Sequence, residues 1–255
     1  MMNQNSSGFL GGIPVVTKNI IIINLLFWVA SIALARVGIN MVSIFGLHIP
    51  GATDYYTYQI VSYMFMHDTH SFAHVFFNMF AVYMFGRVLE ETWGPKRFLA
   101  FYLIAGIGAG LMQEAVWLFN LREVVFVTAD QINLNGVEVI GRHEFLNYFV
   151  TIGASGAVFG ILLAFGMLFP NVSLYLMFLP IPIKAKYFVI LYGLAELYMG
   201  VANYGGDDVA HFAHLGGMLF GYLVIQYWRV KDRRDAEDAD DPYDRFNPKN
   251  GNRYF

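Results

Sequence analysis

The amino-acid sequence predicts an all-α membrane protein in which several apolar helices pack as a bundle. Of the 255 residues, 57% are hydrophobic and 14% are charged, whereas soluble domains average roughly 45–50% apolar and about 25% charged residues. Long apolar segments recur along the chain, and their lengths are close to the roughly 20 residues that a helix needs to cross a bilayer. We predict six membrane-spanning helices, at residues 20–37, 72–90, 98–119, 148–169, 187–203 and 209–228.

Two further properties of the composition exclude other classes of function. The net charge is −3, so nothing indicates a basic surface for nucleic acid, and we expect no nucleic-acid partner. The chain has no cysteine, which excludes disulfide bonds, catalysis by a thiol and zinc sites built on cysteine. Any catalytic chemistry must therefore rest on other side chains.

Basic residues beside the predicted helices indicate how the chain is oriented. Lys18, Lys96 and Lys186 flank helix ends that share one side of the membrane, and the loops on the other side carry few basic residues. Because basic residues gather on the cytoplasmic side, we predict that both termini are cytoplasmic. We divide the chain into an N-terminal cytoplasmic segment, a membrane domain and a charged, disordered cytoplasmic tail, at residues 1–19, 20–229 and 230–255.

The outer loop at residues 120–147 carries the signal of a β-hairpin. Asn135 and Gly136 stand between two runs with alternating apolar residues, at 124–127 and 137–140. Asn-Gly between such runs is typical of a tight hairpin turn. We therefore predict a short two-stranded hairpin outside the membrane.

Polar residues inside the predicted helices are the candidates for function. Ser155 lies between Gly153 and Gly156 in the fourth helix, although a serine among small residues is more often a packing residue. His214 in the sixth helix is ionisable, and such residues inside a membrane span are functional by default. The alternative for His214 is a structural histidine bonded to a backbone carbonyl group.

His74 and Asn78 are four residues apart in the second helix, so they share one face. Both side chains can donate hydrogen bonds, and the alternative is a polar clasp between helices. At 1.5 Å per residue, Asn78, Ser155 and His214 lie about 9, 10 and 8 Å below the outer ends of their helices. These three helices run in the same direction, so we predict that the side chains converge in one layer near the outer surface.

Acyl-transfer chemistry assigns a role to each of these side chains. A serine hydroxyl is a weak nucleophile until a neighbouring base takes its proton, and His214 is the candidate base for Ser155. The oxyanion of a tetrahedral intermediate needs preorganised donors, which Asn78, His74 and the Ser155 N–H can supply. We find no carboxylate at the spacing of a third triad member, so the sequence predicts a Ser–His dyad.

With these motifs in this order, the sequence resembles the rhomboid family of intramembrane serine proteases over about residues 20–228. The matching motifs are His74-x-x-x-Asn78, Gly153-Ala154-Ser155-Gly156, Ala213-His214-Leu215-Gly216-Gly217 with Gly221, and Gly86-Arg87-x-x-Glu90-x-x-Trp93-Gly94 with Arg97-Phe98. The resemblance, to the bacterial type with a six-span core, implies a six-transmembrane-helix rhomboid-like bundle. It also implies a water-filled cavity that opens to the outer face, and a location in the bacterial inner membrane.

The resemblance also implies the site. Ser155 and His214 form the catalytic dyad, His74 and Asn78 bind the oxyanion, and Gly153 and Gly156 support them. Many members carry a tyrosine that stacks on the catalytic histidine where this chain has Phe159, and we expect the phenyl ring to stack in the same way. The implied substrates are transmembrane helices of other proteins in contact with membrane lipid, and we expect no cofactor and no metal.

Three other functions fit parts of the sequence. A rhomboid-like protein without catalytic activity would bind membrane clients, although such proteins typically lack the serine or the histidine. A metal protein could use His67, His70 and His74, or His211 with His214, but the chain has no His-Glu-x-x-His motif. A transporter could use the embedded carboxylates Glu114 and Glu196, whose roles the sequence leaves open.

Overall fold

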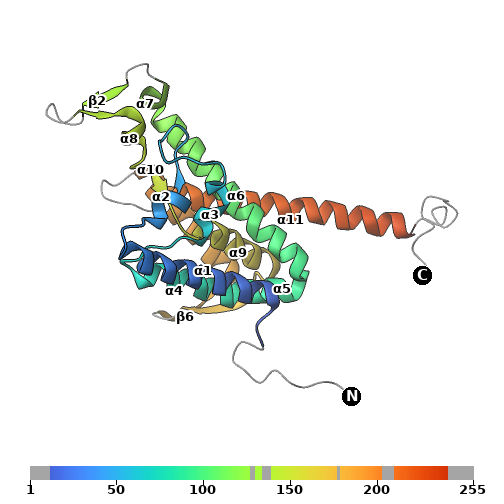
Figure 1. The fold of residues 1–255 in the computed structure, drawn as a ribbon. Helices are drawn as coiled ribbons and strands as arrows, with labels where there is room; N and C mark the ends of the chain where they lie inside the picture. The colour runs from blue at the N-terminus through green and yellow to red at the C-terminus, as the bar shows by residue number, and fades with distance from the viewer. Residues whose placement is uncertain (1–11, 127–129, 134–138, 177–178, 203–209, 241–255) are drawn as a thin grey trace, which may run out of the picture.

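The computed structural model describes residues 12–126, 130–133, 139–176, 179–202 and 210–240. It is a bundle of helices with short strands at its ends (Figure 1). Within these described residues, four stretches of helix are long and apolar enough to cross a membrane, which confirms the helices predicted at 20–37, 72–90, 98–119 and 187–203. They are α1 (Val15–Ala35), the continuous run of α4 (Phe72–Ala81), the π-helical η3 (Val82–Gly86) and α5 (Arg87–Trp93), then α6 (Pro95–Asn120) and α10 (Ala185–Ala202).

The other two predicted spans differ from the prediction. The helix α9 (Ser155–Leu168) has 14 residues, so the predicted start at residue 148 is wrong. The helix α11 (His211–Asp240) has 30 residues, and polar residues such as His211 and His214 interrupt its apolar stretch. That the chain crosses the membrane six times therefore stays a prediction.

The C-terminal tail was predicted to be disordered from residue 230, and this is wrong for residues 230–240. These residues continue α11 as a regular helix, which projects beyond the bundle toward the C-terminus (Figure 1). Opposite charges four residues apart, such as Lys231 with Asp235 and Arg233 with Glu237, favour a helix over a coil. Residues 241–255 lie outside the described residues.

Close packing of α11 against α6 and α9 forms the centre of the bundle. A Cβ atom on Gly217 would overlap the carbonyl oxygen of Gly156, so the two helices touch backbone to backbone at that point. A Cβ on Gly160 would lie 2.7 Å from Cβ of Ala105, and one on Gly221 would lie 3.0 Å from Cζ of Phe101. Glycines thus allow α6, α9 and α11 to approach closely, as expected for helices in lipid.

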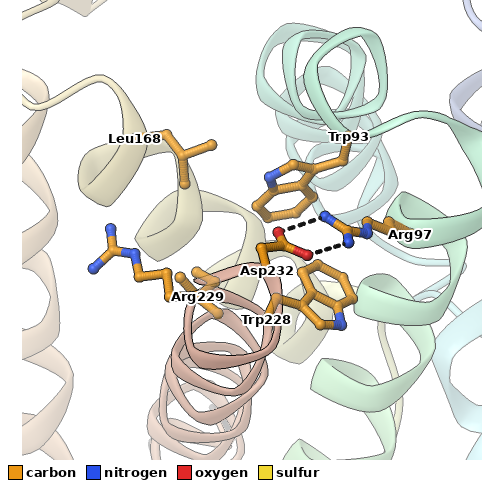
Figure 2. A pocket seen from close by; sticks show the side chains of 7 residues that line it. Trp93, Arg97, Leu168, Trp228, Arg229 and Asp232 are labelled. Atoms are coloured by element: carbon orange, nitrogen blue, oxygen red, sulfur yellow. Dashed lines mark hydrogen bonds and ion pairs between the residues drawn. The ribbon is translucent and has the colours of Figure 1, made fainter. Parts of the chain in front are cut away.

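Two polar contacts join helices at the end of the bundle where α5 meets α6. Glu90 is buried and accepts hydrogen bonds from the backbone N–H groups of Val16 and Thr17, at 2.9 and 2.7 Å. It therefore satisfies N–H groups at the start of α1 that have no partner within the helix. The second contact joins α6 to α11, where Arg97 forms a bidentate ion pair with Asp232 beside a small pocket (Figure 2).

Short elements fill the loop between α1 and α4 and close one wall of the site. They are α2 (Met41–Phe45), β1 (Leu47–His48), α3 (Gln59–Ser62) and the 3₁₀ turn η2 (Tyr63–Phe65). The strand β1 pairs antiparallel with β4 (Val150–Thr151), with Leu47 opposite Thr151 and His48 opposite Val150. Because this pairing makes residues 150–151 extended, α9 cannot begin where the sequence predicted.

The loop between α6 and α9 contains the predicted hairpin in altered form. The strands β2 (Gln131–Asn133) and β3 (Val139–Gly141) pair antiparallel, but residues 122–126 form the helix α7 (Arg122–Phe126) rather than the first strand. Val124 and Val125 pack beside Trp117 in a small apolar cluster, whereas consecutive side chains of a strand point to opposite faces. The predicted turn lies outside the described residues.

The remaining elements complete the chain. The helix α8 (Arg142–Leu146) follows β3, and Figure 1 shows α7, α8 and the hairpin together at one end of α6. Between α9 and α10, β5 (Ser173–Leu176) pairs antiparallel with β6 (Leu179–Lys184). The sequence reasoning did not predict this second hairpin.

Candidate active site

Ser155 is the first residue of α9, and the backbone before it sets its position. Gly153 has a φ of +126°, a conformation that favours glycine, and its N–H donates to the carbonyl oxygen of Tyr63 at 2.9 Å. The chain thus leaves the β1–β4 pair, turns at Gly153 and enters the helix at Ser155. The first N–H groups of a helix have no partner within it, so those at the start of α9, beside Ser155, are available as donors.

The histidine predicted as the base lies against this serine. Nε2 of His214 is 2.8 Å from Oγ of Ser155, although the two residues come from different helices. Phe159, one helical turn after Ser155, stacks on His214 with ring centroids 4.2 Å apart and an interplanar angle of 9°. The structure therefore brings together the predicted nucleophile, the predicted base and the aromatic ring that was expected to support the base.

A carboxylate that the sequence reasoning did not assign completes this group. Oε2 of Glu196, on α10, is 2.8 Å from Nδ1 of His214 and 2.7 Å from Nδ1 of His211. The expectation that no carboxylate stands in the third position is wrong in this structure. The sequence carried a usable signal, because Glu196 lies six residues from the C-terminal end of α10, or about 9 Å along the helix axis, which matches the depth predicted for the other site residues.

His74 faces Ser155 across Gly153. A Cβ atom on Gly153 would lie 2.9 Å from Nε2 of His74 and 3.6 Å from Oγ of Ser155, so the glycine keeps this space open. Nδ1 of His74 is 3.4 Å from the backbone N–H of Asp68. An acceptor role at Nδ1 leaves the proton on Nε2, which makes Nε2 a donor toward the space beside Ser155.

His74 is held by the ring of His67 and, through Asp68, by a loop that Trp28 fixes to the bundle. His67 packs its ring against that of His74 with centroids 5.0 Å apart, and burial lowers the pKa of His67 to about 3, so this ring is neutral at physiological pH. Trp28 on α1 donates to the carbonyl oxygen of Asp68 at 3.0 Å, which ties the loop to the bundle. The sequence reasoning had considered His67 only as a metal ligand.

Asn78 occupies the same face of α4 one turn after His74. Its Nδ2 donates one hydrogen bond to the carbonyl oxygen of His74 at 2.9 Å, and the side chain is 6% exposed. An amide group has two N–H donors, so this bond leaves a second N–H. The structure therefore places Asn78 beside His74, as the spacing predicted.

Comparison with known proteins identifies the fold. A family model described as the rhomboid domain matches residues 54–230, which is more than half of the chain. The chain belongs to the rhomboid family.

The curated relatives include rhomboids of mitochondria and chloroplasts. The chain is 29% identical to the mitochondrial rhomboid protein 1 of Saccharomyces cerevisiae over 177 residues, which are 68% of this chain and 43% of the relative. It is also 29% identical to the chloroplastic rhomboid-like protein 11 of Arabidopsis thaliana over 174 residues, 66% of this chain and 51% of that protein. It is 26% identical to the human mitochondrial presenilin-associated rhomboid-like protein over 164 residues, 62% of this chain and 35% of the relative. The chain spans about half the length of these relatives, or less.

One of the two histidine groups that the sequence offered as metal ligands comes together in the structure. Glu196, His211 and His214 are a group within the described residues whose ligand atoms lie within 4.8 Å of one another. The set of His67, His70 and His74 does not appear as such a group in the part of the chain that the structure describes. The hydrogen bonds from both Nδ1 atoms to one carboxylate oxygen account for the proximity of the first group.

Glu114, the other carboxylate left open, lies beside Tyr55. The pKa of the Tyr55 hydroxyl is raised, first by burial and then by the charge of Glu114. Glu114 therefore belongs to the contact between α6 and the loop that joins α1 to α4.

Proposed function

We propose that this rhomboid-family protein is an intramembrane serine endopeptidase with Ser155 as nucleophile and His214 as general base. The observation that carries the proposal is the 2.8 Å contact between Oγ of Ser155 and Nε2 of His214. Nδ1 of His214 faces a carboxylate, which can only accept, so Nε2 presents its lone pair to the serine. This is the arrangement in which a histidine activates a hydroxyl group.

The first half of the reaction forms an acyl-enzyme. Oγ of Ser155 attacks the carbonyl carbon of the scissile peptide bond, and its proton moves to Nε2 of His214. The tetrahedral oxyanion forms in the space bordered by Nε2 of His74, the amide of Asn78 and the first N–H groups of α9. When the intermediate collapses, His214 returns the proton to the leaving amine and the C–N bond breaks.

The second half repeats these roles with water. His214 takes a proton from a water molecule, the resulting hydroxide attacks the acyl carbon, and the same donors hold the oxyanion. Collapse releases the carboxylic acid product and restores the Ser155 hydroxyl. The cycle needs no cofactor.

The first test is covalent labelling of the purified, full-length protein with a fluorophosphonate probe. We expect the probe to label the unmodified protein and not Ser155→Ala. Ser62→Ala is a matched control, because Ser62 is a partly buried serine that donates to the carbonyl oxygen of Phe45 at 2.8 Å, and it should keep full labelling. A rhomboid-like protein that only binds membrane clients would give no labelling in any variant.

The proposed substrates are transmembrane helices cut near their outer ends, at a locally unwound site. His214 and Asn78 lie within two turns of the starts of α11 and α4, so the scissile bond must reach a depth of about 5–9 Å along the helix axis. A substrate carbonyl inside an intact helix is already hydrogen-bonded, and unwinding in lipid leaves backbone groups without partners. Gly and Pro lower the cost of unwinding.

Single-span reporters test this substrate class. A Gly–Pro pair placed near the outer end of the reporter helix should be cleaved faster than a Leu–Leu pair at the same depth. Equal cleavage of both reporters, or cleavage nearest the opposite face, contradicts the proposed mechanism. A location in the bacterial inner membrane stays a prediction, and the relatives named above are mitochondrial or chloroplastic.

The proposed orientation places the N-terminus and α11 after residue 228 on the cytoplasmic side. The chain has no cysteine, so single cysteines report accessibility without background. The introduced thiol of Arg234→Cys should react only with a thiol reagent that reaches the inner side. The introduced thiol of Glu123→Cys should react with a thiol reagent that is restricted to the outer side. The reverse pattern would contradict the orientation.

A further inference from the structure

Glu196 occupies the position from which a third residue acts on a catalytic histidine. It is 3% exposed, lies on a different helix from the serine and the histidine, and its Oε2 bonds to Nδ1 of His214 and of His211. A carboxylate in this surrounding is costly unless hydrogen bonds compensate for the lost water. Two N–H donors on one oxygen supply that compensation.

We propose that Glu196 is a positioning residue that fixes the tautomer of His214 and stabilises its protonated form, and that His211 holds Glu196 in place. This inference rests on the proposed protease function and extends it from a dyad to a group of Ser155, His214 and Glu196. Neutral imidazole carries one proton. With the carboxylate at Nδ1, that proton stays on Nδ1, and Nε2 is free to accept from Ser155.

The charge of Glu196 matters when the proton moves. As Ser155 attacks, its proton passes to Nε2, and His214 becomes a cation with both nitrogens protonated. The carboxylate at 2.8 Å stabilises this cation without itself taking a proton, as in the known triads. The Nδ1–H group of His214 then donates to Glu196, and the Nε2–H group donates to the leaving amine. The amine takes the Nε2 proton when the peptide bond breaks.

His211 and Phe159 restrict the remaining freedom of this group. His211 lies one turn before His214 on the same face of α11, and its bond to the same oxygen prevents the Glu196 carboxylate from rotating away. Phe159 covers one face of the His214 ring. The imidazole is thus held at Nδ1, at Nε2 and over one face, so its orientation is set before substrate binds.

The structural alternative is a polar clasp that only joins α10 to α11. A clasp and a positioning residue differ in what they change, because a clasp alters stability and leaves the chemistry untouched. The titratable groups around His214 are Ser155 on α9, Glu196 and Tyr192 on α10, His211 on α11 and His74 on α4. Of these, Glu196 alone is an anion, so its removal should change how activity depends on pH.

The experiment compares purified Glu196→Gln with the unmodified protein, using a single-span reporter across pH 5 to 9. We expect kcat to fall by about 10²–10⁴, as for loss of the carboxylate in a serine-protease triad, with little change in KM. The acid limb of the pH–rate profile should move to lower pH, since the His214 cation loses its counter-charge. Glu196→Asp keeps the charge and should retain the position of that limb even if kcat falls.

Glu114→Gln is the matched control, because Glu114 is also embedded in the bundle but contacts Tyr55. It should leave kcat and the acid limb unchanged. If Glu196→Gln lowers thermal stability while kcat and the pH profile stay as in the unmodified protein, the clasp interpretation replaces the proposal.

Two further outcomes complete the test. If Glu196→Gln does not fold, His211→Asn provides the second variant, and a loss of kcat with unchanged KM supports the proposal while unchanged kcat overturns it. If the unmodified protein neither cleaves the reporter nor reacts with the fluorophosphonate probe, the protease function fails and this inference fails with it. An undiminished kcat and an unmoved acid limb in Glu196→Gln, beside inactive Ser155→Ala, overturn the inference alone.

Discussion

The two ends of α11 are both joined to other helices by charged groups, but the two junctions differ in burial. At the N-terminal end, which is the outer end in the proposed orientation, His211 and His214 are buried and share one oxygen of a Glu196 that is 3% exposed. Toward the C-terminal end, which is the inner end in the proposed orientation, the side chains of Arg97 and Asp232 are 43% and 48% exposed. The inner pair lies beside the rings of Trp93 and Trp228 (Figure 2), which provide apolar packing.

The difference supports the proposal that the junction at Glu196 serves chemistry. An exposed ion pair is screened by water and contributes little to stability, so the inner junction is replaceable by packing. A buried carboxylate with two imidazole partners is expensive to maintain, and packing α10 on α11 would be achieved more cheaply by apolar residues. The outer junction touches the Ser155–His214 pair directly, which is the reason that we assign it a function.

Loss of the nucleophile or the base should have the largest effect. Ser155→Ala and His214→Ala should each lower kcat by about 10⁶ with the fold retained, by comparison with a soluble serine protease. The double variant should be hardly worse than either single variant, because the two residues act as a unit. Reporter cleavage and thermal unfolding of all three proteins measure this, and losses that multiply would contradict the pairing.

Loss of an oxyanion donor should have a smaller effect at the same end of the molecule. Asn78→Ala should lower kcat by about 10- to 10³-fold, at the low end if His74 and the α9 N–H groups compensate. KM should change little, because the donor acts on the developing charge. Asn78→Asp is the matched control, since it keeps the size but removes the N–H donors, and it should lose at least as much activity. A change in thermal stability alone would favour the polar clasp predicted as the alternative.

The middle of α11 lies between the two junctions, and a substitution there should mainly lower the stability of the protein. Gly217→Ala places a methyl group on the carbonyl oxygen of Gly156, so the helices must separate, at a cost of about 1–3 kcal/mol for an overpacked core. Activity should fall as well, because Gly156 follows Ser155 directly. Gly193→Ala is the control, since its methyl would meet only the flexible end of Met218 at 3.1 Å. Equal melting temperatures for Gly217→Ala and Gly193→Ala would contradict the predicted separation of α9 and α11.

The sequence predicted much of the site and less of its surroundings. Helical periodicity placed His74 beside Asn78, because that pair follows from geometry within one element. Ser155 and His214 lie on different helices, and their proximity was predicted from similar depths in helices that run in the same direction. The start of α9 was mispredicted because strand pairing between residues 47–48 and 150–151 depends on segments far apart in the sequence. Glu196 was missed for the same reason, since its contact with His214 depends on how α10 packs against α11.

The inner junction should give the smallest effect, and it completes the comparison. Arg97 lowers the pKa of the Asp232 carboxyl below its usual 3.8, so any stability from this pair is present above pH 3.8 and is lost as pH falls through the lower value in the folded protein. Asp232→Asn should therefore shift the melting temperature only slightly at pH 7, less still in 1 M salt, and progressively less as pH falls below 3.8. Reporter cleavage should be unchanged at neutral pH. The neighbouring Asp235→Asn serves as the control for loss of one negative charge. If Asp232→Asn lowered kcat as Glu196→Gln is expected to do, exposure would not distinguish the two ends of α11, and the argument that burial marks the functional junction would be wrong.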